Sequence, residues 1–127
     1  MRFEREAKPG GPIVTGFAGG GFRIEEEVFR ALLLTPERFA EWTPPPIGEL
    51  TPAGIEDVLA IEPAPEFLLL GTGTTLARPP ASFTAALEAR GIGVEAMDSR
   101  AAARAWGVLR GEGRWIAAAL YSLTAGG

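Results

Sequence analysis

The feature that most constrains this chain is an unbroken apolar run, WIAAALY, over residues 115–121. The run shows no alternation of apolar and polar residues, so it does not fit a strand with one face in water. It is typical of a central strand that is covered on both faces. The rest of the chain must therefore supply neighbouring strands and a layer on each side of the sheet.

A helix is predicted directly before this run. Asp98 and Ser99 are both good N-cap residues, and the alanine-rich segment after them favours helix. Four residues recur at helical spacing and predict a buried stripe: Ala102, Ala105, Trp106 and Leu109. A different stripe carries arginine and glycine: Arg100, Arg104, Gly107 and Gly111. Gly111 is expected to take the left-handed conformation that follows a helix end.

The preceding segments predict an α/β sandwich. Residues 66–70 form a short apolar strand, residues 80–90 a helix, and residues 93–96 another strand. With the helix and strand that follow, strands and helices alternate, which is the order of an α/β fold. A further helix is expected to begin at Pro52, with Thr51 as its N-cap.

The first part of the chain is predicted to be mainly strand. Residues 13–17 and 22–24 flank a glycine-rich turn and predict an N-terminal β-hairpin. Residues 28–34 predict a third strand, after a run of three glutamates that we expect to be solvated. Phe39 and Trp42 are expected to anchor a proline-rich loop to the core. We interpret residues 1–127 as a single domain in which residues 1–12 form a tail or lead-in.

Composition excludes several classes of function. The chain has no cysteine and no histidine, which excludes disulfides, thiolate nucleophiles, histidine-based triads and most transition-metal sites. The net charge of −4 does not favour nucleic acid. No apolar run approaches the roughly 20 residues that span a bilayer, and the N-terminus lacks the apolar segment of a signal peptide. These features predict a cytoplasmic protein, and the preference for arginine over lysine is typical of a GC-rich bacterial genome.

Two loops are the candidate binding residues. The first comprises Gly71, Thr72, Gly73 and Thr74, and the second Met97, Asp98 and Ser99. If the strands before them are neighbours, both loops lie at the carboxyl end of the sheet, where open α/β folds bind ligands. Amides at the helix start, helped by Arg100 or Arg104, would suit a small anionic ligand.

Each of these features also has a structural interpretation. The glycines permit a tight turn, Asp98 and Ser99 cap a helix, and the two arginines lie on a solvated face. The loop at residue 71 is neither a phosphate loop nor a dinucleotide fingerprint. The carboxylates Glu95, Asp98 and Glu112 have no spacing that indicates an acid/base pair. We therefore expect no cofactor, no metal and no catalytic constellation.

The segments EFLLLGTG (residues 66–73) and GVEAMDSRAAARAWGVLRGEGRWIAAAL (residues 93–120) resemble the domain of unknown function 498 family. The resemblance implies a three-layer α/β sandwich around a mixed central β-sheet, with about three helices besides the N-terminal hairpin. It also implies a central last strand, antiparallel to most others. The family usually has Arg-Thr-Tyr-Asn where this chain has Arg104, Ala105, Trp106 and Gly107.

The family's mitochondrial relatives assist the assembly of respiratory complex I. The resemblance therefore implies a non-enzymatic accessory protein that binds a protein partner, with Arg100, Arg104 and Gly107 as contact residues near the glycine loop. The alternative is a small-molecule or anion-binding protein with its pocket at the two loops, and a carboxylate-based enzyme is third. Fold alone does not transfer function.

Overall fold

The computed structural model describes residues 5–6 and 10–124. The apolar run forms strand β9 (Ala117–Leu120), and all of its residues are buried. Three of these residues are alanines, whose small side chains let layers on both faces approach the sheet closely. The prediction of a doubly covered central strand is confirmed.

The large sheet has six strands in the order β1-β6-β5-β9-β7-β8. Their bounds are β1 (Arg5–Glu6), β6 (Arg38–Glu41), β5 (Leu32–Leu34), β7 (Phe67–Gly71) and β8 (Gly93–Met97), with β9 between β5 and β7. β9 pairs antiparallel with β5 and parallel with β7, and β7 pairs parallel with β8. The sheet is mixed, as expected. However, β9 is antiparallel to β5 and β1 alone and runs parallel to the other three strands, so the expectation that it opposes most strands is wrong.

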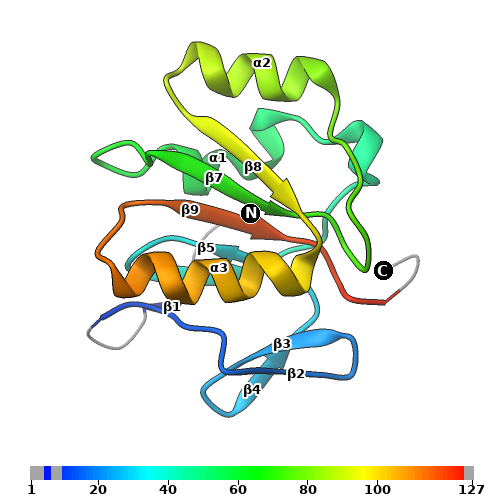
Figure 1. Ribbon diagram of the computed structural model, residues 1–127, viewed down its shortest axis with the longest axis vertical. Helices are drawn as coiled ribbons and strands as arrows, with labels where there is room; N and C mark the ends of the chain where they lie inside the picture. The colour runs from blue at the N-terminus through cyan, green and yellow to red at the C-terminus, as the bar shows by residue number, and fades with distance from the viewer. Residues whose placement is uncertain (1–4, 7–9, 125–127) are drawn as a thin grey trace.

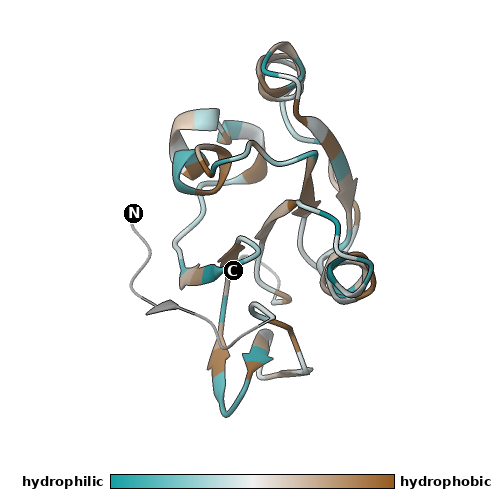
Figure 2. Cartoon of the chain, turned by 90° about the vertical axis from the view of Figure 1, so that its left-hand side faces the viewer, coloured by the Kyte–Doolittle hydropathy of each residue, from teal (hydrophilic) through white to brown (hydrophobic). Residues whose placement is uncertain are grey.

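Helices cover both faces of this sheet (Figures 1 and 2). On one face lie the 3₁₀ helices η1 (Ile47–Glu49) and η2 (Pro52–Ile55), α1 (Glu56–Leu59) and α2 (Ala81–Ala89). Ile55, Val58 and Leu87 belong to one core cluster with the sheet residues Leu68 and Leu70. The predicted three-layer arrangement with about three helices is confirmed.

The opposite face carries α3 (Ser99–Gly111) and a small antiparallel sheet. That sheet consists of β2 (Gly16–Ala18), β3 (Gly21–Ile24) and β4 (Glu27–Phe29). Trp106 of α3 and Phe22 of β3 are both fully buried, in a cluster with Leu69 and Leu120 of the large sheet. The predicted N-terminal hairpin is confirmed as β2–β3, and α3 and the small sheet share one core.

The single strand predicted over residues 28–34 is wrong. The chain instead leaves β4 of the small sheet, turns at Arg30 and Ala31, and enters β5 of the large sheet. The amide of Arg30, between the two strands, donates to the Glu41 carboxylate at 2.8 Å. A side chain thus accepts this backbone hydrogen bond where the chain passes from one sheet to the other. β6, which contains Phe39, was not predicted, although Phe39 and Trp42 are buried as expected.

Helix ends also differ from the predictions. Gly111 is the last residue of α3, and Gly113 takes the left-handed conformation with φ of 77°. Thr51 makes no side-chain capping hydrogen bond, and a 3₁₀ turn comes before α1. The expected lead-in over residues 1–12 includes β1, while its residues 1–4 and 7–9 lie outside the described part.

Candidate functional site

The two predicted loops meet at one edge of the large sheet, after β7 and β8. The amide of Thr72 donates to the Met97 carbonyl at 2.9 Å. The amide of Ser99 donates to the Gly73 carbonyl at 2.8 Å, and the amide of Gly73 donates to Ser99 Oγ, also at 2.8 Å. Because β7 and β8 are parallel neighbours, their carboxyl ends are adjacent, and these hydrogen bonds join the loops.

Most side chains at this junction form hydrogen bonds or packing contacts within the fold. Asp98 accepts from the amide of Ala101 at 2.9 Å, which is the N-cap bond that the sequence predicted. Ser99 is fully buried. A Cβ on Gly71 would lie 2.8 Å from Ser99 Oγ and 2.9 Å from Leu120 Cδ2, so the glycine permits close contact between loop and helix. The first-turn amides of Ser99 and Ala101 therefore already have acceptors.

The Thr72 side chain makes hydrogen bonds within its own loop. Its hydroxyl donates to the Thr75 carbonyl at 2.7 Å and accepts from the amide of Ala77 at 2.9 Å. Thr74 is exposed in the same loop, and Met97 is half-buried against the core cluster that contains Trp106. Polar groups of this loop thus hold its shape.

The arginine stripe of α3 lies beside the small sheet. The guanidinium carbons of Arg100 and Arg104 lie 4.9 and 5.7 Å from the ring centroid of Phe17 in β2. Such distances are those of cation–π contacts, which keep both cations on one surface. A Cβ on Gly107 would meet nothing within 4 Å, and the neighbouring Val108 is 62 % exposed. The stripe is therefore an exposed, positively charged surface, and Val108 adds an exposed apolar side chain at one end.

Trp106 is the aromatic residue in the middle of α3. Its side chain is fully buried, and its indole Nε1 donates to the Pro12 carbonyl at 2.8 Å. The aromatic thus keeps a packing role and also fastens the segment that precedes β2.

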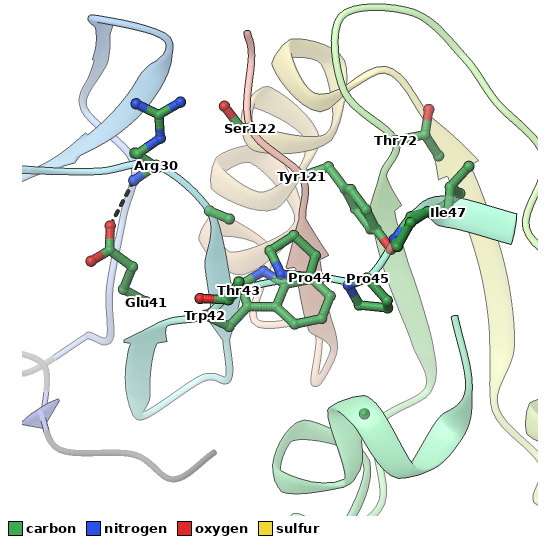
Figure 3. A pocket seen from close by; sticks show the side chains of 13 residues that line it. Arg30, Glu41, Trp42, Thr43, Pro44, Pro45, Ile47, Thr72, Tyr121 and Ser122 are labelled. Carbon is green, nitrogen blue, oxygen red and sulfur yellow. Dashed lines mark hydrogen bonds between the residues drawn. The ribbon is translucent and has the colours of Figure 1, made fainter. Parts of the chain in front are cut away.

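An open pocket with a volume of about 1120 Å³ lies on the other face of the sheet from α3 (Figure 3). It is found where β7 and β9 end, at the carboxyl ends of these parallel strands. Aromatic, proline and hydroxyl side chains form most of its wall, which is lined by Arg30, Ala31, Glu41, Trp42, Thr43, Pro44, Pro45, Pro46, Ile47, Gly54, Thr72, Tyr121 and Ser122. Thr72 is the one residue of the predicted loops in this lining.

Trp42 and Tyr121 form the aromatic part of the pocket. Their ring centroids are 5.6 Å apart with an interplanar angle of 81°, an edge-to-face arrangement. Trp42 Nε1 donates to the Leu120 carbonyl at 3.2 Å, so the indole is fixed to the end of β9. The Tyr121 hydroxyl is buried and has no hydrogen-bond partner among the described residues. Burial raises the pKa of Tyr121 to about 12, so the hydroxyl stays protonated at neutral pH.

The sequence did not single out this pocket. Trp42 was predicted as a core anchor and residues 44–46 as a loop, and neither carries a local pattern of a binding site. A long-range contact brings them to Tyr121, which follows the central strand by one position. The available signal was topological, since ligands in α/β folds bind beyond the carboxyl ends of parallel strands.

The carboxylates with shifted pKa values belong to surface ion pairs. Hydrogen bonding from Arg114 lowers the pKa of Glu66, helped by the backbone amide of Trp115. Hydrogen bonding from Arg90 likewise lowers the pKa of Glu56. Within residues 5–6 and 10–124, no group of acidic side chains is arranged to hold a metal ion. In the same part of the chain, no helix has the length and apolarity to cross a bilayer.

Comparisons with known proteins give consistent matches. The family model described as "Protein of unknown function (DUF498/DUF598)" matches residues 14–121. An uncharacterised protein of Rhodobacter capsulatus is 34% identical over 114 residues, which cover 87% of this chain and 84% of that protein. The NADH dehydrogenase [ubiquinone] 1 alpha subcomplex assembly factor 3 of Danio rerio is 30% identical over 124 residues, 97% of this chain and 71% of that protein.

A crystal structure of a protein from Bordetella parapertussis has a similar fold. The two superpose with a TM-score of 0.79 at 32% identity, covering 88% of this chain and 96% of that chain. The likeness extends over nearly the whole of both chains.

Proposed function

Because this chain belongs to the DUF498/DUF598 family of proteins of unknown function, we propose that it is a non-enzymatic accessory protein that assists assembly of a respiratory or other membrane-associated complex. One observation carries the proposal: the alignment with an assembly factor of NADH dehydrogenase over 97% of this chain. The protein acts in the cytoplasm by binding a protein partner.

The arginine stripe of α3 is the proposed contact surface. Arg100 and Arg104 lie four residues apart on the exposed side of the helix, and Phe17 holds both guanidinium groups above the small sheet. Gly107 leaves open space beside them, and Val108 adds exposed apolar area. Arginine beside apolar surface is enriched at protein interfaces. An acidic partner surface with an apolar centre fits this arrangement.

An anionic ligand at the two loops is less favoured. Two of the first-turn amides of α3, those of Ser99 and Ala101, already donate to Gly73 and Asp98. An anion at this helix start would have to displace the bond between Ser99 and the loop after β7, or the Asp98 cap of α3.

Cross-linked pull-down from the native cells tests the proposal. The test variant is Arg100→Glu/Arg104→Glu, and the control is Arg78→Glu, which reverses a charge on an exposed residue away from α3 and outside the ion pairs of Arg90 and Arg114. Both variants are first compared with wild type by thermal unfolding. We expect wild type and control to capture subunits of a membrane-associated complex, and the test variant to lose them.

Two other results would contradict parts of the proposal. Equal capture by both variants would remove the stripe as the contact surface. If wild type captures no such subunit above background, the accessory role itself is refuted.

A further inference from the structure

The Trp42–Tyr121 pocket has walls suited to a flat, apolar molecule. Trp42 and Tyr121 are held edge to face, and the indole is fixed by its bond to the Leu120 carbonyl. Residues 44–46, all prolines, and Ile47 complete an apolar wall. Aromatic and aliphatic walls with a small number of polar groups are the usual lining of small-molecule sites. A volume of about 1120 Å³ in an open pocket accommodates a single ring with its substituents.

One buried polar group of this pocket has no hydrogen-bond partner among the described residues. The hydroxyls of Thr72 and Ser122 donate to the carbonyls of Thr75 and Gly20, at 2.7 and 3.2 Å. The Tyr121 hydroxyl, by contrast, has no partner among the described residues, although the residue is only 6 % exposed. Buried hydroxyls are nearly always hydrogen-bonded, so an unpartnered one at a pocket wall indicates a missing acceptor.

Figure 3 shows the Tyr121 side chain extending toward Ile47, within the ring of lining residues. Solvent does not reach the hydroxyl oxygen itself. A ligand that accepts a hydrogen bond from this hydroxyl must therefore move the covering side chains slightly apart. The neighbouring prolines favour this hydroxyl as the donor, because proline has no backbone N–H to offer.

Charge in the pocket favours a neutral ligand. Of the residues that the structure describes, Arg30 and Glu41 are the charged ones in the lining, and their formal charges cancel. Figure 3 shows both on the side of the pocket opposite Ile47. The Arg30 guanidinium already donates to Thr124 at 3.1 Å, and the Glu41 carboxylate accepts from the Arg30 amide. The described lining therefore carries no net formal charge, and the Glu41 carboxylate lies on the same side as the Arg30 cation, which does not favour an anionic ligand.

We propose that this pocket binds a neutral, planar, mainly apolar molecule whose carbonyl oxygen accepts a hydrogen bond from the Tyr121 hydroxyl. The ring of the ligand lies against Trp42 and the proline wall. The site is independent of the arginine stripe, which lies on the other face of the large sheet.

The test uses acetophenone as the probe and α-methylstyrene as its control, since both have an sp2 carbon on the ring and a similar outline, and they differ in the carbonyl acceptor. Binding is followed by NMR titration of the full chain, observing the indole N–H of Trp42. Gly54→Leu places a side chain at the pocket wall, where an added Cβ has only Thr51 Oγ1 near it, at 3.9 Å. Gly48→Leu is the matched control, because Gly48 lies in the other 3₁₀ helix, outside the lining, with nothing within 4 Å of an added Cβ.

We expect acetophenone to shift the Trp42 signal, with at least tenfold weaker binding in Gly54→Leu and unchanged binding in Gly48→Leu. Tyr121→Phe should weaken acetophenone binding about three- to tenfold and leave α-methylstyrene binding unchanged, as expected for loss of one hydrogen bond. Absence of acetophenone binding to wild type would overturn the proposal, as would equal binding to both leucine variants. Equal affinity of acetophenone for wild type and Tyr121→Phe would remove the hydroxyl from the site.

Discussion

Replacing Tyr121 by phenylalanine should alter how stability depends on pH. Tyr121 is the single tyrosine of the chain, and burial raises the pKa of its hydroxyl from 10.0 to about 12. Below pH 10 the hydroxyl is protonated in both the folded and the unfolded chain, so it contributes no pH dependence. Above pH 10 the unfolded chain loses this proton first, and the free energy of unfolding falls as pH rises toward 12.

The magnitude follows from the size of the shift. Each pKa unit corresponds to about 1.4 kcal/mol, so a shift of about two units removes about 1.4 kcal/mol by pH 11. The full loss approaches about 2.7 kcal/mol above pH 12. Tyr121→Phe has no proton to lose and should escape this fall. At neutral pH the variant should be about as stable as wild type, because it removes a buried hydroxyl that has no partner.

Denaturant unfolding of wild type and Tyr121→Phe at neutral pH and near pH 11 measures the difference. Few other groups titrate in this window, because the chain has no cysteine and its single lysine is Lys8. The near-ultraviolet absorbance of tyrosinate gives the pKa of the folded protein directly. A midpoint near 10, or parallel losses of stability in both proteins, would refute the argument that burial governs this hydroxyl.

Three further substitutions test α3, two of them at its junction with the loops and one within the helix. Gly71→Ala should lower the free energy of unfolding by about 1–3 kcal/mol, because its Cβ would meet Ser99 Oγ at 2.8 Å; chemical unfolding that shows no loss would contradict the packing argument. Gly107→Ala should raise it by about 0.5–1 kcal/mol, since the added Cβ meets nothing within 4 Å and helix propensity improves; a fall in melting temperature would show otherwise. Ser99→Ala should lower the free energy of unfolding by about 1–3 kcal/mol, because the amide of Gly73 loses its acceptor. Hydrogen exchange at the Gly73 amide should accelerate. Unchanged protection of this amide would show that the bond to Ser99 does not hold the loop to α3.

The second half of the fold was largely predictable because local signals agree there. The run at residues 115–121 predicted a buried strand, Asp98 marked the start of α3, and β7, α2 and β8 follow in the expected order. In each of these segments the residues that define an element are adjacent in the sequence. Burial of β9 by other layers then confirms the pattern and does not compete with it.

The strands in the first half of the chain are defined by pairing with distant strands, which a local sequence pattern does not reveal. Residues 28–34 have the composition of one strand, yet Phe29 pairs with Phe22 in the small sheet while Leu32 pairs with Leu120 in the large one. The division results from the two sheets competing for the chain. β6 was missed for the same reason, since its pairing with β5 and β1 defines it.

The placement of the candidate residues was predictable only in part. Asp98 acts as the expected cap, and the two loops meet as their strand order required. Phe17 was not predicted as a neighbour of Arg100, because a hairpin distant in the sequence carries it. Trp42 and Tyr121 come together only when β9 enters the middle of the sheet, so the pocket is a product of topology.

The place of β9 also constrains how the chain can fold while it is being made. The strands β1, β6 and β5 form one part of the large sheet, β7 and β8 form the other, and β9 joins the two. A ribosome completes both parts before it reaches residue 117. Until then β5 and β7 each present an unpaired edge, which is a template for wrong pairing. A nascent chain halted before β9 should therefore remain sensitive to protease across the whole sheet, and release of residues 117–120 should protect both parts together.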